Sequence, residues 1–298
     1  IFYTKILHHL RRTKMRFYVV IPAHNEEAFI KDCLVSLMEQ SLPPKKIIVV
    51  DDNSNDQTAQ IVNELIQRYP CIDMVQHQSS EKHLPGEKII NAFYKGFEQL
   101  DDAYDVVCKF DADLIFPKNY LETIAKHYKN DPKLGLIAGH CYIEKNKQWI
   151  LENLTSNDHI RGPLKAYRKA CFEAIGGLKK SMGWDTIDEL VALYNGWSFR
   201  TDDTLHVKHM KPTGSTYNKN AKYYQGIALY KMRNGFVLAF LSALKLAYKK
   251  RKMRLFLDYL MGYLKAWLMK TPFIVSADEG AFIRKYRWQK IKKLILGD

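Results

Sequence analysis

The sequence lacks three features that would each assign it to a familiar class of protein. Its five cysteines include no close pair, so neither a disulfide framework nor a zinc knuckle is expected, and the compartment is expected to be a reducing cytosol. No stretch of about 18 residues is free of charge, which argues against a membrane-spanning helix. Residues 1–14 form a basic leader without an initial methionine and too short in apolar length for a signal peptide, so Met15 is the expected native start.

Acidic residues are scarce in the last quarter of the chain. Residues 1–219 hold 29 Lys and Arg against 28 Asp and Glu, whereas residues 220–298 hold 17 against 4. Nearly all of the formal net charge of +14 therefore lies in the tail. This asymmetry predicts a boundary near residues 212–215 and an anionic partner for the tail.

The chain does contain a regular alternation of β-rich apolar runs with helical patterns. Helices are expected over residues 27–40, 56–69, 87–99 and 119–128, and strands near residues 17–21, 47–50, 72–76, 105–110 and 134–142. This order is typical of βαβ units in an open α/β sheet. Ligands of such sheets bind beyond the carboxyl ends of the strands, so polar motifs at those ends are candidate sites.

Three polar motifs fall at those strand ends. They are residues 19–27 (VVIPAHNEE), residues 47–58 (IIVVDDNSNDQT) and residues 104–113 (YDVVCKFDAD). In the third motif, Asp111 and Asp113 are two residues apart and can grip a hard divalent cation. An ordinary polar turn is the alternative for each motif, and Asn25 would then serve as a helix cap.

Together these stretches resemble the nucleotide-sugar-binding half of family 2 glycosyltransferases, inverting enzymes with a GT-A fold. The resemblance, to members of the bacterial cell-surface polysaccharide type, implies a GT-A catalytic domain over residues 15–215. It also implies Mn²⁺ or Mg²⁺ held by the carboxylates of Asp111 and Asp113. The nucleotide-sugar-binding positions that it implies are Pro22, His24, Glu26, Asp52, Lys88 and Asp111.

The chemistry of Asp52 narrows the donor. The resemblance gives this carboxylate a hydrogen bond from the nucleotide base, and an ionised acid only accepts hydrogen bonds. Uracil and guanine offer a suitable N–H, so a UDP- or GDP-linked sugar is expected. For Lys88 the resemblance implies a position near the pyrophosphate, and an exposed helix lysine is the alternative.

The second half of the chain is expected to supply the acceptor side. An ungapped match of residues 183–197 (GWDTIDELVALYNGW) to the family's Glu-Asp pair implies that Asp185 is the general base, with Trp184 in place of the usual Glu. Asp188, one helical turn further on, is the alternative base. The alternative is that Asp185 only caps the helix that follows it. Trp184 is expected to exclude water and so to raise the pKa of Asp185.

His209 falls where some members of the family return a histidine to the metal and the diphosphate. Neutral imidazole is a reasonable ligand for Mn²⁺, so His209 joins Asp111 and Asp113 as a candidate metal ligand. A purely structural histidine is the alternative. In an extended segment, His206 is expected to point to the opposite side.

The tail, residues 216–298, is expected to be a basic helical segment that associates with a membrane surface. Within residues 251–269, a narrow polar stripe formed by Arg254, Asp258, Gly262 and Lys265 is surrounded by apolar residues. Each basic residue near an anionic leaflet contributes about 1 kcal/mol to binding. Packing on the catalytic domain, or on a second subunit of a homo-oligomer, is the alternative.

The expected function is metal-dependent transfer of a sugar to a hydroxyl of a glycan or lipid-linked acceptor, at the inner face of the cytoplasmic membrane. A sugar-phosphate nucleotidyltransferase is one alternative, but it would need a glycine-rich phosphate loop, and residues 22–25 contain no glycine. A non-catalytic membrane or nucleic-acid adaptor is another. No recognised nucleic-acid module is present, so nucleic acid is not an expected partner.

Overall fold

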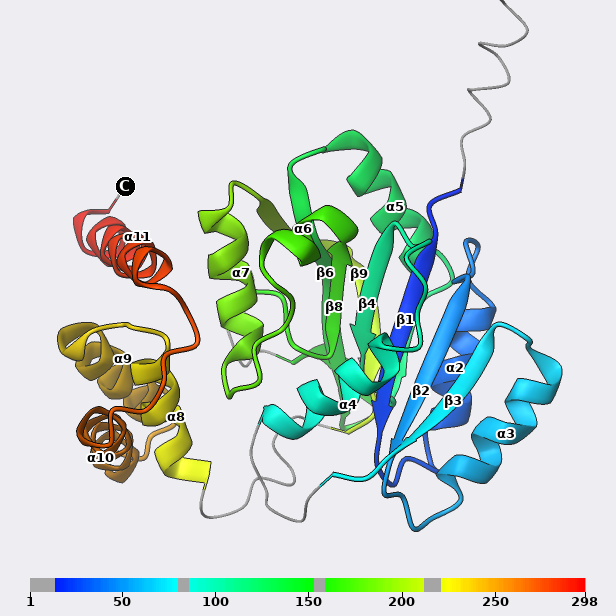
Figure 1. The fold of residues 1–298 in the computed structure, drawn as a ribbon, viewed down its shortest axis with the longest axis horizontal. Coiled ribbons are helices and arrows are strands. Elements are labelled where there is room, and N and C mark those ends of the chain that lie inside the picture. Colours follow the sequence, from blue (N-terminus) through cyan, green and yellow to red (C-terminus); the bar gives the residue numbers. More distant parts are fainter. Residues whose placement is uncertain (1–13, 80–85, 153–158, 212–220, 298) are drawn as a thin grey trace, which may run out of the picture.

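A nine-stranded mixed sheet is the centre of the computed structural model, which describes residues 14–79, 86–152, 159–211 and 221–297 (Figure 1). The strands lie in the order β3-β2-β1-β4-β8-β6-β9-β5, and β7 pairs with β6. The first four are parallel neighbours: β3 (Ile72–His77), β2 (Lys46–Asp52), β1 (Phe17–Ala23) and β4 (Val106–Phe110). Three of them, β1, β2 and β4, are buried almost throughout, as their continuous apolar runs predict for parallel strands.

The second half of the sheet continues from β4 with mixed strand directions. β8 (Leu164–Arg168) is antiparallel to both β4 and β6 (Leu134–Lys145), while β9 (Ser198–His209) runs parallel to β6. β7 (Gln148–Leu151) forms a hairpin with β6. The two-residue strand β5 (Leu114–Ile115) pairs with the end of β9, with Leu114 opposite His209. This pairing places the residue after Asp113 beside His209.

Six helices accompany the described part of the sheet. They are α2 (Ile30–Met38), α3 (Thr58–Arg68), α4 (Glu87–Phe97), α5 (Tyr120–Asn130), α6 (Lys169–Ala174) and α7 (Trp184–Tyr194). α4 crosses the parallel strands in Figure 1, and its Phe97 ring lies 5.2 Å from the Phe172 ring of α6. Gly86 is the N-cap of α4, and its backbone is left-handed with φ of 80°.

Four further helices stand beside the sheet, on the side of α7 (Figure 1). They are α8 (Ala221–Lys231), α9 (Phe236–Lys249), α10 (Arg254–Leu268) and α11 (Ala277–Leu296). α11 meets α7 through the rings of Phe282 and Tyr194, 5.7 Å apart. The crossing of α8 and α10 is very close, because a Cβ placed on Gly226 would lie 1.8 Å from the carbonyl oxygen of Tyr259.

The structure confirms the α/β order expected from the sequence and corrects two details. β5, β7, β8 and β9 are not among the expected strands. The first three are short, and β8 contains a buried lysine, Lys165. The polar stripe on α10 faces solvent only at its ends, Arg254 and Lys265: Asp258 and Gly262 are buried, and Gly262 packs against the backbone of Tyr223 in α8. The wide apolar face is therefore the one that α10 leaves exposed.

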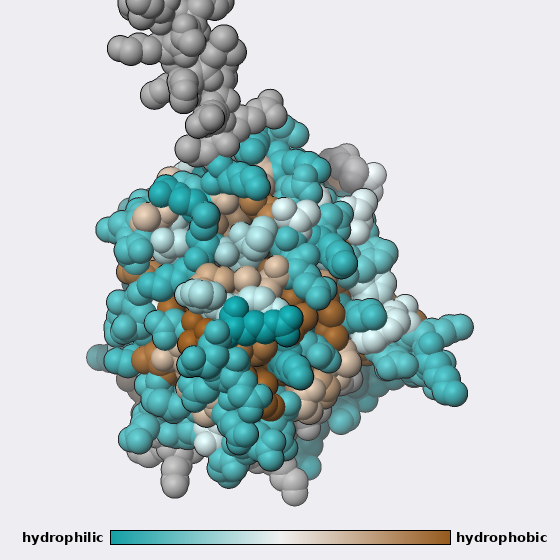
Figure 2. Space-filling view, turned by 90° about the vertical axis from the view of Figure 1, so that its right-hand side faces the viewer, coloured by the Kyte–Doolittle hydropathy of each residue, from teal (hydrophilic) through white to brown (hydrophobic). Residues whose placement is uncertain are grey.

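The boundary expected near residues 212–215 lies outside the described residues. Within the described part, none of the helices combines the length and the apolar character needed to cross a bilayer. The face that Figure 2 presents is the side of the molecule away from the C-terminal helices, and hydrophilic residues cover most of it. Hydrophobic residues show there in smaller groups near the middle of the view.

Candidate active site

The carboxyl ends of β1 and β2 bring two of the expected nucleotide-binding residues together. His24 is exposed, and its Nδ1 lies 2.6 Å from the backbone oxygen of Asp52. The carboxylate of Asp52 accepts a hydrogen bond from the backbone N–H of Ser79 at 2.9 Å. Pro22, earlier in β1, lies opposite Val50 and is half-buried. These residues form one edge of a site at the end of the parallel strands.

Glu26 lies between this edge and the acidic pair. Its Oε2 atom lies 2.6 Å from Nζ of Lys211, just beyond the end of β9. Burial raises the pKa of Glu26, the Lys211 ammonium opposes the rise, and the negative charges of Asp113 and Asp111 add to it. Lys211 thus balances part of the negative charge that Glu26, Asp111 and Asp113 bring together.

Asp111 is held by a lysine on β4, the strand that ends directly before it. Lys109 is buried, and its ammonium forms an ion pair with Oδ1 of Asp111. The same Nζ atom lies 5.5 Å from the ring centroid of Trp184, at the start of α7. Because alternate residues of a strand share a face, the position of Lys109 two residues before Asp111 was a signal available in the sequence.

Asp113 meets His209 across the pairing of β5 with β9. Nε2 of His209 lies 3.4 Å from Oδ2 of Asp113, and its Nδ1 lies 2.7 Å from Oε2 of Glu152. Glu152 is also ion-paired with Arg161. Burial lowers the pKa of His209, but hydrogen bonding and charge attraction from Asp113 and Glu152 raise it to about 9. His206 is exposed, as expected for the opposite side of the strand.

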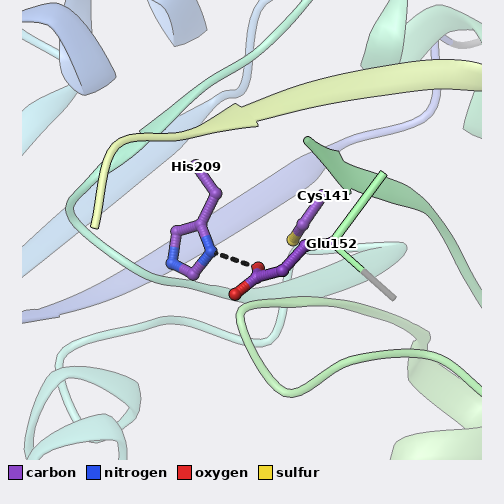
Figure 3. A group of neighbouring side chains, drawn as sticks. All are labelled: Cys141, Glu152 and His209. Atoms are coloured by element: carbon purple, nitrogen blue, oxygen red, sulfur yellow. Dashed lines mark hydrogen bonds and ion pairs between the residues drawn. The ribbon is translucent and has the colours of Figure 1, made fainter. Parts of the chain in front are cut away.

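Cys141 lies close to His209 and Glu152, and ligand atoms of all three fall within 4.8 Å of one another (Figure 3). Figure 3 shows the three side chains converging, with the hydrogen bond from His209 to Glu152 marked. Burial raises the pKa of the Cys141 thiol to about 12, which keeps it protonated, and a thiol is a poor ligand for a hard cation. The better donor set for Mn²⁺ or Mg²⁺ is the carboxylate of Asp113 with the imidazole of His209, whose raised pKa means that a binding cation would displace a proton from it.

Asp185 and Asp188 lie in different surroundings on α7. The Asp185 side chain is about one-third exposed (33%), in the first turn of a helix that Gly183 caps. The Asp188 side chain is only 1% exposed and bonds to Nζ of Lys165 at 3.0 Å and to the hydroxyl of Tyr167. Burial raises the pKa of Asp188 to about 7. Of the two carboxylates, only that of Asp185 is accessible from outside.

The expected rise in the pKa of Asp185 is wrong. Trp184 is buried beside it, and burial does push this pKa upward. However, the polar contact with His159 and the attraction of its charge, with a contribution from Lys165, lower the pKa of Asp185 overall. His159 lies 3.6 Å from the carboxylate and was not among the candidate residues, because a lone histidine gives no motif in the sequence.

The two halves of the site meet at the turn of residues 161–163. The backbone N–H of Asp111 donates to the oxygen of Pro163 at 3.1 Å. At Gly162, an added Cβ would lie 3.0 Å from the ring of Trp184 and 3.5 Å from the carboxylate of Asp185. Asp185 therefore lies across one short turn from the acidic pair.

Lys88 lies in the first turn of α4 and is half-buried. Gly86, which starts that helix, packs against the backbone of Ser181 and Met182, the residues that lead into α7. A Cβ at Gly86 would lie 2.6 Å from the Ser181 oxygen, so only glycine permits this approach. Lys88 therefore lies on the side of the site near the start of α7.

Comparison with known proteins assigns this arrangement to a family. The model of the family described as "Glycosyl transferase family 2" matches residues 18–176, which include the three motifs and Asp111 and Asp113. A probable glycosyltransferase of Bacillus subtilis, YdaM, is 36% identical over 123 residues, 41% of this chain and 28% of the relative. The poly-beta-1,6-N-acetyl-D-glucosamine synthase of Staphylococcus aureus is 27% identical over 140 residues, 47% of this chain and 32% of the relative. The matched part thus spans about a third of these relatives.

Solved structures extend the likeness of fold over more of the chain. The mannosyltransferase PcManGT from Pyrobaculum calidifontis, in complex with GDP-Man and Mn²⁺, has a TM-score of 0.55 at 15% identity and covers 97% of this chain and 87% of its own. S. aureus TarS 1–349 in complex with UDP-GlcNAc has a TM-score of 0.55 at 18% identity and covers 84% of this chain and 73% of its own. The fold is therefore a mixed α/β, GT-A-like fold followed by a C-terminal helical region.

Proposed function

Because this chain belongs to glycosyl transferase family 2, we propose that it transfers a sugar from a nucleoside diphosphate to an acceptor hydroxyl, with Mn²⁺ or Mg²⁺ and with inversion. The observation that carries the proposal is the 3.4 Å approach of Asp113 to His209 beside Asp111. UDP- or GDP-linked sugars are the proposed donors. Proteins of similar fold form complexes with UDP-GlcNAc, and with GDP-Man and Mn²⁺, which supports this class of donor.

The proposed cation ligands are Asp113, His209 and Asp111. In octahedral coordination, two neighbouring ligand atoms that each lie about 2.1 Å from the ion subtend a right angle at it and are therefore about 3 Å apart. The 3.4 Å between Asp113 Oδ2 and His209 Nε2 is close to that spacing. When bound, the cation would offset the negative charge of the departing nucleoside diphosphate. Lys109 adds positive charge beside Asp111, and Lys211 adds positive charge beside the neighbouring Glu26.

The nucleotide is proposed to lie across the carboxyl ends of β1 and β2. His24, exposed there, would lie against the base, and Asp52 would accept a hydrogen bond from a base N–H. Pro22 and Glu26 would line the same edge. Lys88, at the start of α4, would lie near the pyrophosphate, where a helix N-terminus also favours an anion.

Asp185 is the proposed general base. Its exposed carboxylate would take the proton of the acceptor hydroxyl as the oxygen forms its bond to the anomeric carbon. The bond from that carbon to the diphosphate breaks on the opposite face, so the configuration inverts. Asp188 is the less suitable base, because its carboxylate is enclosed by Lys165 and Tyr167.

Calorimetric titration tests the donor half of the proposal directly. The whole chain should bind UDP, GDP or one of their sugars only when Mn²⁺ or Mg²⁺ is present, and Asp113→Ala should abolish that dependence. Asp203→Ala is a matched control, because Asp203 also pairs with a histidine, His140, but its side chain is 90% exposed. Equal metal-dependent affinity in Asp113→Ala and the parent would refute the proposed site. Absence of any metal-dependent nucleotide binding would favour a non-catalytic adaptor.

A membrane surface is the proposed location, and it would suit a lipid-linked acceptor. Large apolar side chains are exposed along α9 and α10, and they include Phe236, Val237, Leu257, Met261, Trp267 and Leu268. Exposed basic residues flank them: Lys245, Lys249, Lys250, Arg251, Lys252, Arg254, Lys265 and Lys270. An apolar face bordered by cations suits the anionic headgroups of an inner leaflet. The alternative occupant of this face is a second subunit.

Vesicle sedimentation distinguishes the two occupants. The whole chain should pellet with vesicles that contain phosphatidylglycerol, and less so at high salt, because exposed charges are screened. Met261→Glu should weaken this binding, whereas Ile150→Glu, at an exposed apolar position on β7, should not. Indifference to anionic lipid, together with a dimer in solution that Met261→Glu dissociates, would instead assign the face to subunit contact.

A further inference from the structure

A histidine that the proposed mechanism does not use lies directly against the proposed base. Nε2 of His159 lies 3.6 Å from Oδ2 of Asp185, and its Nδ1 lies 2.9 Å from Oε2 of Glu189. The imidazole is only 13% exposed. His159 thus stands between two carboxylates of α7, one accessible and one buried.

Glu189 is fixed by further contacts. Its Oε1 accepts a hydrogen bond from the backbone N–H of Ile160 at 2.8 Å and another from Nζ of Lys165 at 3.0 Å. Lys165 is fully buried and also donates to the backbone oxygen of Asp185 at 2.6 Å. Both oxygens of Glu189 are therefore occupied, so it anchors the imidazole through Nδ1 and sets the direction of Nε2.

The charges around His159 determine its protonation. Two cations, His159 and Lys165, face the carboxyl groups of Asp185, Asp188 and Glu189. Burial lowers the pKa of His159, but the polar contacts with the carboxylates of Asp185 and Glu189 and the attraction of their charges raise it to about 9. At neutral pH both ring nitrogens therefore carry hydrogen, and the ring donates in both directions.

We propose that His159 is a positioning residue for the transfer reaction: anchored by Glu189, it directs Nε2–H at Oδ2 of Asp185, so that Asp185 presents Oδ1 to the acceptor hydroxyl. This inference rests on the proposed function, because it gives a partner to the base named there. The acceptor proton ends on Asp185, since the imidazolium has no lone pair to receive it. The 3.6 Å contact is longer than a hydrogen bond, and such contacts tighten when substrates bind.

A titration without turnover tests the pair first. In the ¹⁵N-labelled whole chain without metal, the imidazole signal that disappears in His159→Gln should titrate near pH 9. In Asp185→Asn its midpoint should fall by about 1–3 pH units, because an opposite charge has been removed. An unchanged midpoint in Asp185→Asn would overturn the inference. This result does not depend on whether the chain transfers sugar, so it separates the inference from the proposed function.

The pH dependence of kcat then tests the role in the reaction, with donor and Mn²⁺ saturating. In His159→Gln, Asp185 loses its cation while its burial remains, so the acidic limb should move upward by more than about 1 pH unit. Donor affinity should stay within about twofold of the parent. A lower kcat with the limb in its original place would make His159 merely structural and overturn the proposal.

Two variants guard this test against a trivial outcome. His127→Gln is a matched control, because His127 also pairs with a carboxylate, Asp202, at 2.6 Å, and it should leave the profile unchanged. Glu189→Gln keeps the imidazole but weakens its anchor, so the His159 midpoint should fall and kcat should drop without loss of donor affinity. If His159→Gln does not fold, Glu189→Gln decides: a kcat equal to that of the parent would overturn the proposal.

Discussion

Substitutions of two carboxylates on α7, Asp185 and Asp188, should affect stability and turnover separately. We consider Asp185→Asn, which neutralises the accessible side chain, and Asp188→Ala, which removes the buried one. Asp188 bonds to Nζ of Lys165 at 3.0 Å, to the Tyr167 hydroxyl and to the backbone N–H of Glu189 at 2.7 Å. Asp185 faces only His159 among charged side chains at ion-pair distance within the described residues.

The magnitudes follow from these surroundings. Removing one partner of a buried ion pair costs roughly 3–5 kcal/mol of unfolding free energy, because the other charge stays buried. Asp188→Ala leaves Lys165 with Glu189 alone and the Tyr167 hydroxyl without an acceptor, so a loss in this range is expected. The Asp185 side chain is one-third exposed, and screening by solvent limits its loss to about 1 kcal/mol. Loss of a general base should instead lower its transfer rate by about 10²–10⁴.

Denaturant unfolding and release of nucleoside diphosphate from the donor are the two measurements. Asp185→Asn should unfold near the parent midpoint, bind donor normally and release the diphosphate slowly. Asp188→Ala should unfold at a much lower denaturant concentration, while each folded molecule keeps most of its turnover. The opposite pattern, a stable but inactive Asp188→Ala with an active Asp185→Asn, would place the base one helical turn further on and refute the assignment.

Three further outcomes are expected. Glu152→Gln should weaken Mn²⁺ binding by about 10–100-fold in calorimetry, because it loosens the partner that orients His209; an unchanged affinity would contradict that role. Gly226→Leu should lower the thermal midpoint sharply, because its side chain would force α8 away from Tyr259, whereas Tyr248→Leu, at an exposed position of α9, should not. The stability that the His159 ion pairs add should be fully present below about pH 6.5 and be lost as the pH rises through about 9, since its folded-state pKa is raised, so His159→Gln should flatten the alkaline part of the stability curve.

The parallel half of the sheet could be predicted because its signals are local. Three of its four strands, β1, β2 and β4, are largely apolar runs followed directly by polar residues, and parallel strands place those ends along one edge. The positions of His24, Asp52 and Asp111 at that edge follow from this rule. Gly176 and Gly177, both with left-handed backbones, follow the end of α6 and are another local signal of this kind.

The surroundings of the proposed base could be predicted only in part, because the roles of the residues there depend on partners that are distant in the sequence. From the sequence alone, Lys165 would be expected at the surface. In the structure it is buried and paired with Asp188 and Glu189. The sequence predicts that the stripe through Asp258 and Gly262 is a polar face of the helix. Because Gly262 has no side chain, α8 can approach closely there, and the stripe is the contact face for α8. Resemblance to a family identified Asp185, but only the tertiary structure shows His159 beside it and the consequent fall in its pKa.

The two-residue strand β5 links binding of the proposed cation to the folding of the chain. Asp113 precedes this strand, and its partner His209 reaches it only when the last residues of β9 pair with Leu114. A folding intermediate that has completed only the parallel strands would hold Asp113 without its imidazole partner. If Asp113 and His209 hold the proposed cation, high affinity for it would appear only at the final closure of the sheet, and a cation present during refolding would favour the fully closed chain over that intermediate.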